Sequence, residues 1–152
     1  MQGHAGIIEI LNEVLTAELT AINQYFIHAM MCEQWRFTRL AKHMRDESIG
    51  EMKHAEELID RILYLDGRPN MQKYMKVNVG QTVSEMHAFD LELERDAVTR
   101  LNPGLELCRS KGDNGSRLLL SRSGHGPCRG SHAHAVRSLS LGARGPEHPS
   151  RD

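Results

Sequence analysis

The sequence lacks long apolar runs and has few cysteines. No stretch approaches the roughly 18 consecutive apolar residues of a membrane span. The acidic N-terminus, which contains His4, lacks the basic-then-apolar order of a signal peptide. We therefore expect a cytoplasmic protein with no membrane partner. The three cysteines, Cys32, Cys108 and Cys128, include no C-x-x-C pair, which argues against a disulfide framework or a zinc ribbon.

The sequence also has almost no net charge. Its 19 Lys and Arg against 20 Asp and Glu give −1, which makes no overall case for a nucleic-acid partner. Residues 1–100, however, carry −5 and the remainder carries +4. The last 32 residues hold 14 Ser, Gly and Pro and only three large aliphatic residues, too few to offset the entropy of ordering them. We predict a folded domain over residues 1–120 and a mostly disordered basic tail over 121–152.

The hydrophobic pattern of the folded part is helical, which predicts an all-α protein. Apolar residues recur at spacings of three and four over residues 7–29, and this pattern indicates a first helix that runs to about Cys32. A second helix is predicted over residues 36–65. Gly67 is expected to supply a left-handed cap there, and Pro69 cannot continue the helix.

Two further helices are predicted. Thr82 or Ser84 can cap the third. Pro103-Gly104 is expected to break or kink it, because proline lacks the amide donor and clashes with the preceding turn. Residues 112–116 are predicted to form a turn before a fourth helix, which begins over residues 117–120 and has no continuation.

Acidic residues occupy core positions on three of these helices. Glu18 lies on the first apolar stripe, Glu51 and His54 on the second, and Glu94 on the third. Burying a carboxylate costs free energy unless the group is paired, protonated or bound to a metal. One bound metal would explain the acidic residues at core positions of all three helices. The Glu-x-x-His spacing places Glu51 and His54 about 60° apart on one helix face. Oxygen and imidazole ligands favour iron or manganese over a structural zinc site.

Other polar side chains on these helices are interpreted as structural. Glu47, Glu56 and Glu57 are assigned to solvated faces or to i,i+4 pairs such as Glu57 with Arg61. Three histidines are interpreted as polar or core-edge residues rather than as metal ligands: His28, His43 and His87.

The methionines are assigned to packing, with one exception. Met31, Met44 and Met86 are treated as flexible core or interface residues. Met52 lies about 100° away from Glu51 on the helix and so faces off the metal stripe. An exposed thioether at that position has no evident packing role.

Several motifs resemble the bacterioferritin family over about residues 1–120. They include Gln2-Gly3-His4, Glu18 through Tyr25, Glu51-Met52-Lys53-His54-Ala55, Pro69-Asn70 and Asp90-Leu91 with Glu94. The resemblance implies a ferritin-like four-helix bundle of up-down-down-up order, with a short fifth helix. It also implies a homo-oligomer, a hollow sphere of 24 subunits that oxidises and stores iron.

The resemblance also implies roles for individual residues. Glu18 and His54 would be terminal ligands of one iron, Glu51 a bridging ligand, and Glu94 a terminal ligand of a second iron. Met52 would be an axial ligand of haem b on a two-fold axis between subunits. The implied activity is oxidation of Fe(II) by oxygen or peroxide, with transfer of Fe(III) to a mineral and haem assisting later release.

The resemblance ends abruptly at Ser121. The family's fourth helix supplies a second Glu-x-x-His, and the aligned positions here are Pro127 and Gly130, neither of which can bind a metal through its side chain. A frameshift near residue 121, natural or from sequencing, is our hypothesis for the change. It predicts that one inserted or deleted base in the coding sequence restores a fourth helix with Glu-x-x-His.

The sequence leaves two other functions open. One is a haem-binding or structural subunit, deficient in ferroxidase activity, that co-assembles in a mixed cage with an intact subunit. The retained Met52 and the lost second ligand set favour it. The other is a helical interaction module without metal, in which the core carboxylates are fortuitous.

Overall fold

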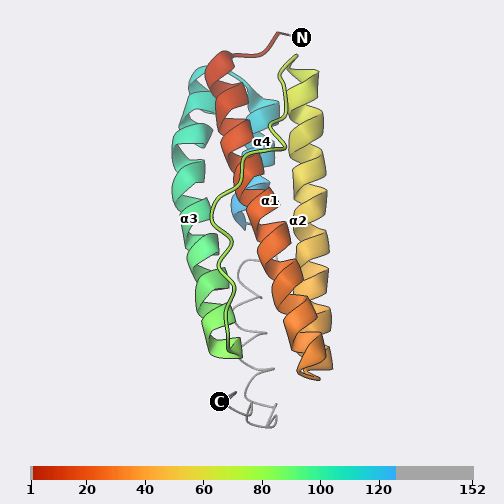
Figure 1. The fold of residues 1–152 in the computed structure, drawn as a ribbon. Coiled ribbons are helices and arrows are strands. Elements are labelled where there is room, and N and C mark those ends of the chain that lie inside the picture. Colours follow the sequence, from red (N-terminus) through yellow and green to blue (C-terminus); the bar gives the residue numbers. More distant parts are fainter. Residues whose placement is uncertain (1, 126–152) are drawn as a thin grey trace.

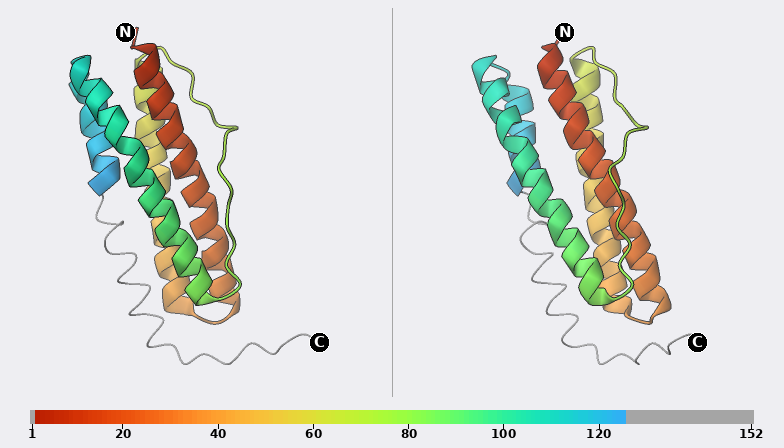
Figure 2. Two further views of the ribbon diagram at one scale, coloured as in Figure 1. Left: turned by 90° about the vertical axis from the view of Figure 1, so that its left-hand side faces the viewer. Right: turned by 60° about the vertical axis from the view of Figure 1, so that its left-hand side comes forward.

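The computed structural model describes residues 2–125, which form a bundle of four helices (Figure 1). The helices are α1 (Ala5–Gln34), α2 (Thr38–Tyr64), α3 (Val83–Ser110) and α4 (Asn114–His125). α1 and α2 form an antiparallel hairpin, and the connection over 65–82 returns along the bundle, so that α3 runs parallel to α2 (Figure 2). The predicted all-α, up-down-down-up bundle is confirmed. None of the described helices is long and apolar enough to cross a bilayer.

The first three helices end in the same backbone motif. Each is followed by a residue in the left-handed conformation: Arg36 (φ 66°), Asp66 (φ 58°) and Gly112 (φ 69°). The next N–H then reaches back to a carbonyl of the last turn, as from Gly67 to Ile62 at 2.9 Å, which is a Schellman motif. The prediction that Gly67 is left-handed is wrong, because Asp66 takes that conformation. Gly67 is needed for space, since a Cβ there would lie 2.7 Å from Ile8.

α3 begins as predicted but does not break at the proline. The hydroxyl of Thr82 accepts the backbone N–H of Glu85 at 3.2 Å and caps the helix. The predicted break at Pro103-Gly104 is absent, since α3 continues to Ser110. Gly104 is buried so closely against α1 that a Cβ would lie 2.6 Å from the side chain of Ile10. This packing holds α3 in place where proline removes one backbone donor.

Two apolar clusters form the core. The N-terminal cluster joins the start of α1 to the ends of α2 and α3, and includes Ile7, Leu11, Leu15, Leu58, Ile62, Leu101, Cys108 and Leu120. The turn cluster lies at the α1–α2 turn and consists of Ala29, Cys32, Leu40, Ala41, Met44 and Met86. Several buried side chains are instead polar or charged: Glu18, Gln24, His28, Glu47, Glu51, Asp90 and Glu94.

A row of polar side chains on α1 holds the long connection. Asn12, Thr20, Gln24 and His28 accept backbone N–H groups of Asn70, Met75, Asn78 and Gly80 at 2.7 to 3.1 Å. Because these four residues are spaced by multiples of four, they follow one i, i+4 row, which winds gradually around the helix. They satisfy backbone donors of a segment that forms neither helix nor strand, and so fix its path along the bundle.

α4 extends further than predicted. It is helical to His125, so residues 121–125 belong to the helix and not to the predicted tail. Leu120 and Ser123 are buried, and the Ser123 hydroxyl donates to the Leu119 carbonyl at 3.3 Å. Packing of this face therefore continues the helix beyond residue 120, where we predicted that the folded domain ends. The rest of the predicted tail lies outside the described residues.

Arg61 of α2 joins α2 to the start of α4. Its guanidinium donates to the carboxylate of Asp113 at 2.7 Å and to the hydroxyl of Ser116 at 2.9 Å. Asp113 in turn accepts the backbone N–H of Ser116 at 2.9 Å, as a helix cap does. The predicted pair of Glu57 with Arg61 is therefore wrong. Glu57 instead lies 3.7 Å from Arg122 of α4.

This junction should make α4 sensitive to acid. Burial acts to raise the pKa of Asp113, but the hydrogen bonds from Ser116 and the charge of Arg61 outweigh it and hold that pKa below its usual value. A carboxyl whose pKa is lowered by folding stabilises the protein above its unfolded pKa, and the contribution is lost as pH falls through the folded pKa. We predict that Asp113→Ala lowers the free energy of unfolding by about 1–2 kcal/mol near neutral pH.

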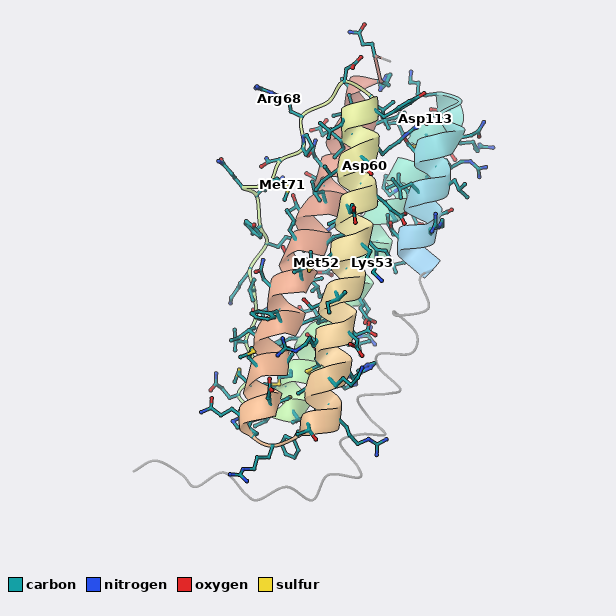
Figure 3. All side chains as sticks on the ribbon, turned by 90° about the vertical axis from the view of Figure 1, so that its right-hand side faces the viewer. Met52, Lys53, Asp60, Arg68, Met71 and Asp113 are labelled. Atoms are coloured by element: carbon teal, nitrogen blue, oxygen red, sulfur yellow. The ribbon has the colours of Figure 1, made fainter. Side chains whose placement is uncertain are left out.

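Urea unfolding at a series of pH values tests this prediction. The difference between the parent and Asp113→Ala should shrink as the pH is lowered from about 7 toward 3, because protonation removes the same ion pair from the parent. Asp60→Ala is the matched control, because Asp60 is an exposed carboxylate of α2 (Figure 3). An effect of Asp113→Ala that is equally large at both ends of the series would contradict the prediction.

Candidate metal centre

Two carboxylates and an imidazole converge between α1 and α2. Glu18, Glu51 and His54 each offer one ligand atom, and these atoms lie within 4.8 Å of one another. Glu18 is 1% exposed and Glu51 4%, while His54 is half-buried. The Nδ1 atom of His54 lies 2.9 Å from a carboxylate oxygen of Glu51. The Glu-x-x-His motif therefore meets the acidic residue of the neighbouring helix, as the sequence predicts.

Small residues and one hydrogen bond bring the helices together at this level. The hydroxyl of Ser48 donates to the backbone carbonyl of Ile22 at 2.9 Å and fixes the register of α2 against α1 close to Glu51. Ala55, the residue after His54, is buried at 4% exposure. Because alanine adds little bulk between helices, the longer ligand side chains have room to meet.

Glu94 of α3 reaches the same region from the other side. It is 9% exposed and lines a small pocket between α1 and α3. The pocket is lined by Ala17, Glu18, Ala21, Tyr25, Leu93, Glu94 and Ala97. Glu94 therefore faces a common pocket with Glu18, but it lies outside the group of three whose ligand atoms meet. Of the four predicted ligands, three come together at one point, and the fourth, Glu94, shares a pocket with one of them, Glu18.

α4 contributes no carboxylate to the centre within its described length. Residues 114–125 contain no Asp or Glu, and the buried residues among those whose side chains are described are Ser116, Leu120 and Ser123. A helix of 12 residues spans about 18 Å, whereas the 28 residues of α3 span about 42 Å. α4 accordingly lies beside only one end of α3 (Figure 2). Pro127 and Gly130 lie outside the described residues.

A second carboxylate on α3 is hydrogen-bonded by neighbouring side chains. Asp90 is fully buried, and it accepts a hydrogen bond from the amide of Gln24 at 2.8 Å and contacts Nδ1 of His28 at 3.1 Å. Because Nε2 of His28 accepts the N–H of Gly80, Nδ1 is the nitrogen that carries the proton and donates to Asp90. His28 therefore has the structural role that the sequence analysis gave it, although it lies in the core.

Glu47 is buried, at 8% exposure. The sequence analysis assigned it to a solvated face or to an i,i+4 pair, and the solvated alternative is wrong. Its carboxylate lies 4.0 Å from Nε2 of His43. The signal that could have found it is its position, since Glu47 lies one helical turn before Glu51 on the same stripe.

Met52 points away from the centre, as predicted. It is 55% exposed on α2, on the outer side of the bundle (Figure 3). Ile49, one helical turn earlier on the same helix, is also exposed, at 46%. Scattered exposed apolar residues are common, but an exposed thioether beside an apolar side chain can serve as a soft ligand.

Comparison with known proteins places this chain in a family. The ferritin-like domain model matches residues 8–122. The bacterioferritin of Mycobacterium bovis is 52% identical over 122 residues, which cover 80% of this chain and 77% of the relative. That of Streptomyces coelicolor is 56% identical over 113 residues, covering 74% and 68%. The solved structure of Mycobacterium tuberculosis bacterioferritin BfrA has a TM-score of 0.86 at 46% identity, over 93% of this chain and 88% of that one. The chain therefore belongs to the ferritin-like family, and within it to the bacterioferritins.

Proposed function

We propose that this chain is an iron-storage subunit that takes Fe(II) into the centre of Glu18, Glu51 and His54. The bacterioferritin relatives support iron storage as its role. The observation that carries the proposal is the meeting of two carboxylates and an imidazole, from two helices, at one buried point. Oxygen and nitrogen ligands of this kind suit iron.

The charge of the centre suits iron in both of its oxidation states. Two carboxylates balance the charge of Fe(II), and Glu94, across the shared pocket, offers a third negative charge when Fe(II) gives an electron to oxygen or peroxide. His54 and Glu51 already hold their ligand atoms 2.9 Å apart, so binding replaces one short contact with two metal bonds. Fe(III) would then pass to a mineral in the cavity of the assembly.

The second iron position is the weaker part of the centre. Glu94 and a bridging Glu51 are the ligands available to it among the described residues, because α4 adds no carboxylate. We therefore propose one complete iron position and one incomplete position in each chain. Oxidation that needs two irons side by side should consequently be slow in this chain.

Haem b is the second group that we propose for this protein, held by Met52. The exposed thioether of Met52, with the exposed Ile49 one helical turn before it, fits a haem ligand on a surface that a second copy of the chain would cover. When bound, haem would carry electrons from an external reductant to the stored mineral for the release of iron. Met52 would hold it, and Ile49 would exclude water beside it.

The bacterioferritin relatives support assembly into a multi-subunit cage. The cage is proposed as either a homo-oligomer or a mixture with a second subunit. A specific observation favours the mixed form: α4 carries no Asp or Glu over 114–125, so an intact partner subunit would have to perform most of the oxidation. In that case this chain is a ferroxidase-deficient, haem-binding subunit. A helical module without metal is the remaining alternative, and it predicts no bound iron.

Anaerobic titration of the purified chain with Fe(II) tests the iron centre. We expect one tightly bound ion per chain. In Glu51→Gln the affinity should fall by roughly tenfold or more, because a charged ligand becomes a neutral amide of the same shape. Glu56→Gln is the matched control, since Glu56 is exposed on the same helix and loses the same charge.

Two outcomes would change the assignment. Parent-like affinity in Glu51→Gln would remove Glu51 from the centre. Two equally tight ions per chain would show that other ligands complete the second position. The rate of Fe(II) oxidation then separates the two subunit types. Oxidation faster than in buffer and slowed by Glu51→Gln supports a ferroxidase, whereas bound haem without such oxidation supports the structural subunit.

The haem assignment is tested by changing Met52 alone. Met52→Leu keeps the side-chain volume but removes the sulfur ligand, so we predict that this variant purifies without the haem absorbance of the parent. Met71→Leu is the control, because Met71 is exposed at 47% on the connection (Figure 3). Equal haem content in parent and Met52→Leu would exclude Met52 as the ligand.

A further inference from the structure

Three sulfur atoms from three helices meet in the turn cluster. The Sγ atom of Cys32 on α1 lies 3.8 Å from Sδ of Met44 on α2 and 3.8 Å from Sδ of Met86 on α3. All three residues are fully buried, at 0% exposure. Cys32 is a free thiol, so its sulfur is available as a ligand. The iron centre uses none of these residues.

The spacing of the sulfurs suits a single metal ion. Metal–sulfur bonds are about 2.3 Å long, so two sulfurs bound to one ion at trigonal or tetrahedral angles lie about 4 Å apart. Both measured distances from Cys32 agree with that separation. Methionine side chains are flexible, so small rotations of Met44 and Met86 would complete the coordination.

Charge balance selects the class of ion. The cluster around the sulfurs is apolar, including Ala29, Leu40 and Ala41, and an uncompensated charge there would be costly. One thiolate and two neutral thioethers supply a single negative charge, which neutralises a monovalent ion. Thiolate and thioether sulfur are also the ligands that select Cu(I). We propose that Cys32, Met44 and Met86 bind one soft monovalent metal ion, of the class of Cu(I) or Ag(I).

Binding is a proton exchange without a redox step. The thiol of Cys32 loses its proton to the solvent as the sulfur–metal bond forms, and the ion keeps its oxidation state. Burial, followed by the charge of Asp90, raises the pKa of Cys32 to about 11, so the metal-free site holds a neutral thiol at physiological pH. Only an ion with high affinity for sulfur displaces that proton.

The position of the site provides a route for the ion. The turn cluster lies where α1 gives way to α2, beneath the partly buried side chains of Trp35 and Phe37. Helix ends open locally at lower cost than helix centres do, so the turn can admit an ion without unfolding the bundle. The iron centre lies further along both helices, which keeps the two sites separate.

The test is an anaerobic Cu(I) titration of the reduced full chain in competition with bathocuproine disulfonate. We expect one Cu(I) per chain. Cys32→Ser should weaken binding roughly a hundredfold or more, and Met44→Leu and Met86→Leu roughly tenfold each, because each removes one ligand. The leucine variants keep the side-chain volume, and far-UV circular dichroism checks their fold.

Matched variants keep the outcome specific to this cluster. Cys108→Ser changes the other buried free cysteine that the structure describes, and Cys128→Ser changes the cysteine outside the described residues. Both should bind Cu(I) like the parent. Glu51→Gln should also bind Cu(I) normally, which separates this site from the iron centre. Parent-like affinity in Cys32→Ser, or no competitive Cu(I) binding by the parent, would overturn the proposal.

A thermal measurement provides a second readout. A ligand that binds only the folded state raises the unfolding midpoint. One equivalent of Ag(I), which does not change its oxidation state here, should raise the midpoint of the parent and of Cys108→Ser but not that of Met44→Leu. An equal rise in Met44→Leu would show that the ion binds elsewhere.

Discussion

The cost of placing carboxylates inside a helical bundle governs the arrangement of this molecule. Glu18, Glu51, Asp90 and Glu94 are all buried in a bundle whose core also contains two apolar clusters. Each such group needs a partner that compensates its charge. For Asp90 the partners are protein groups, because Gln24 and His28 both donate to it. Glu18 and Glu51 meet beside an imidazole with the spacing of metal ligands, so an ion can compensate them.

The side chains of α1 that bind Asp90 also hold the connection between α2 and α3, and so help to set the order of the helices. α2 and α3 can be parallel only if the connection between them travels the length of the bundle, and a segment without regular structure must have its backbone donors satisfied. Gln24 and His28 accept connection N–H groups while their other atoms bind Asp90. A displacement of α1 would therefore disturb the connection, the position of α3 and the ligand Glu18 together.

Helical periodicity made most of the helices and buried acidic residues predictable. Several of the wrong predictions concern local backbone geometry. The stripes of α1, α2 and α3 identified Glu18, Glu51 and Glu94 as buried acids, since a side chain at a core position cannot avoid the core. Glu47 lay on the same stripe and was nevertheless assigned to a solvated face or to an i,i+4 pair, although its position is that of a buried residue. The left-handed Asp66 and the uninterrupted helix at Pro103 depend on contacts made by Gly67 and Gly104, which no local pattern contains.

In our proposals one bundle holds two kinds of metal ion, because the ligands of the metal centre and of the turn cluster differ in charge and in softness. The centre offers two carboxylates and an imidazole, with a third carboxylate nearby, so its charge is matched by an ion of two or three positive charges. The three sulfur ligands of the turn cluster supply one negative charge, that of a thiolate. A monovalent ion matches that charge, whereas a monovalent ion at the centre would leave carboxylates unbalanced. The number of ionisable ligands at each of the two sites therefore favours one class of metal ion over the other, independently of bond distances.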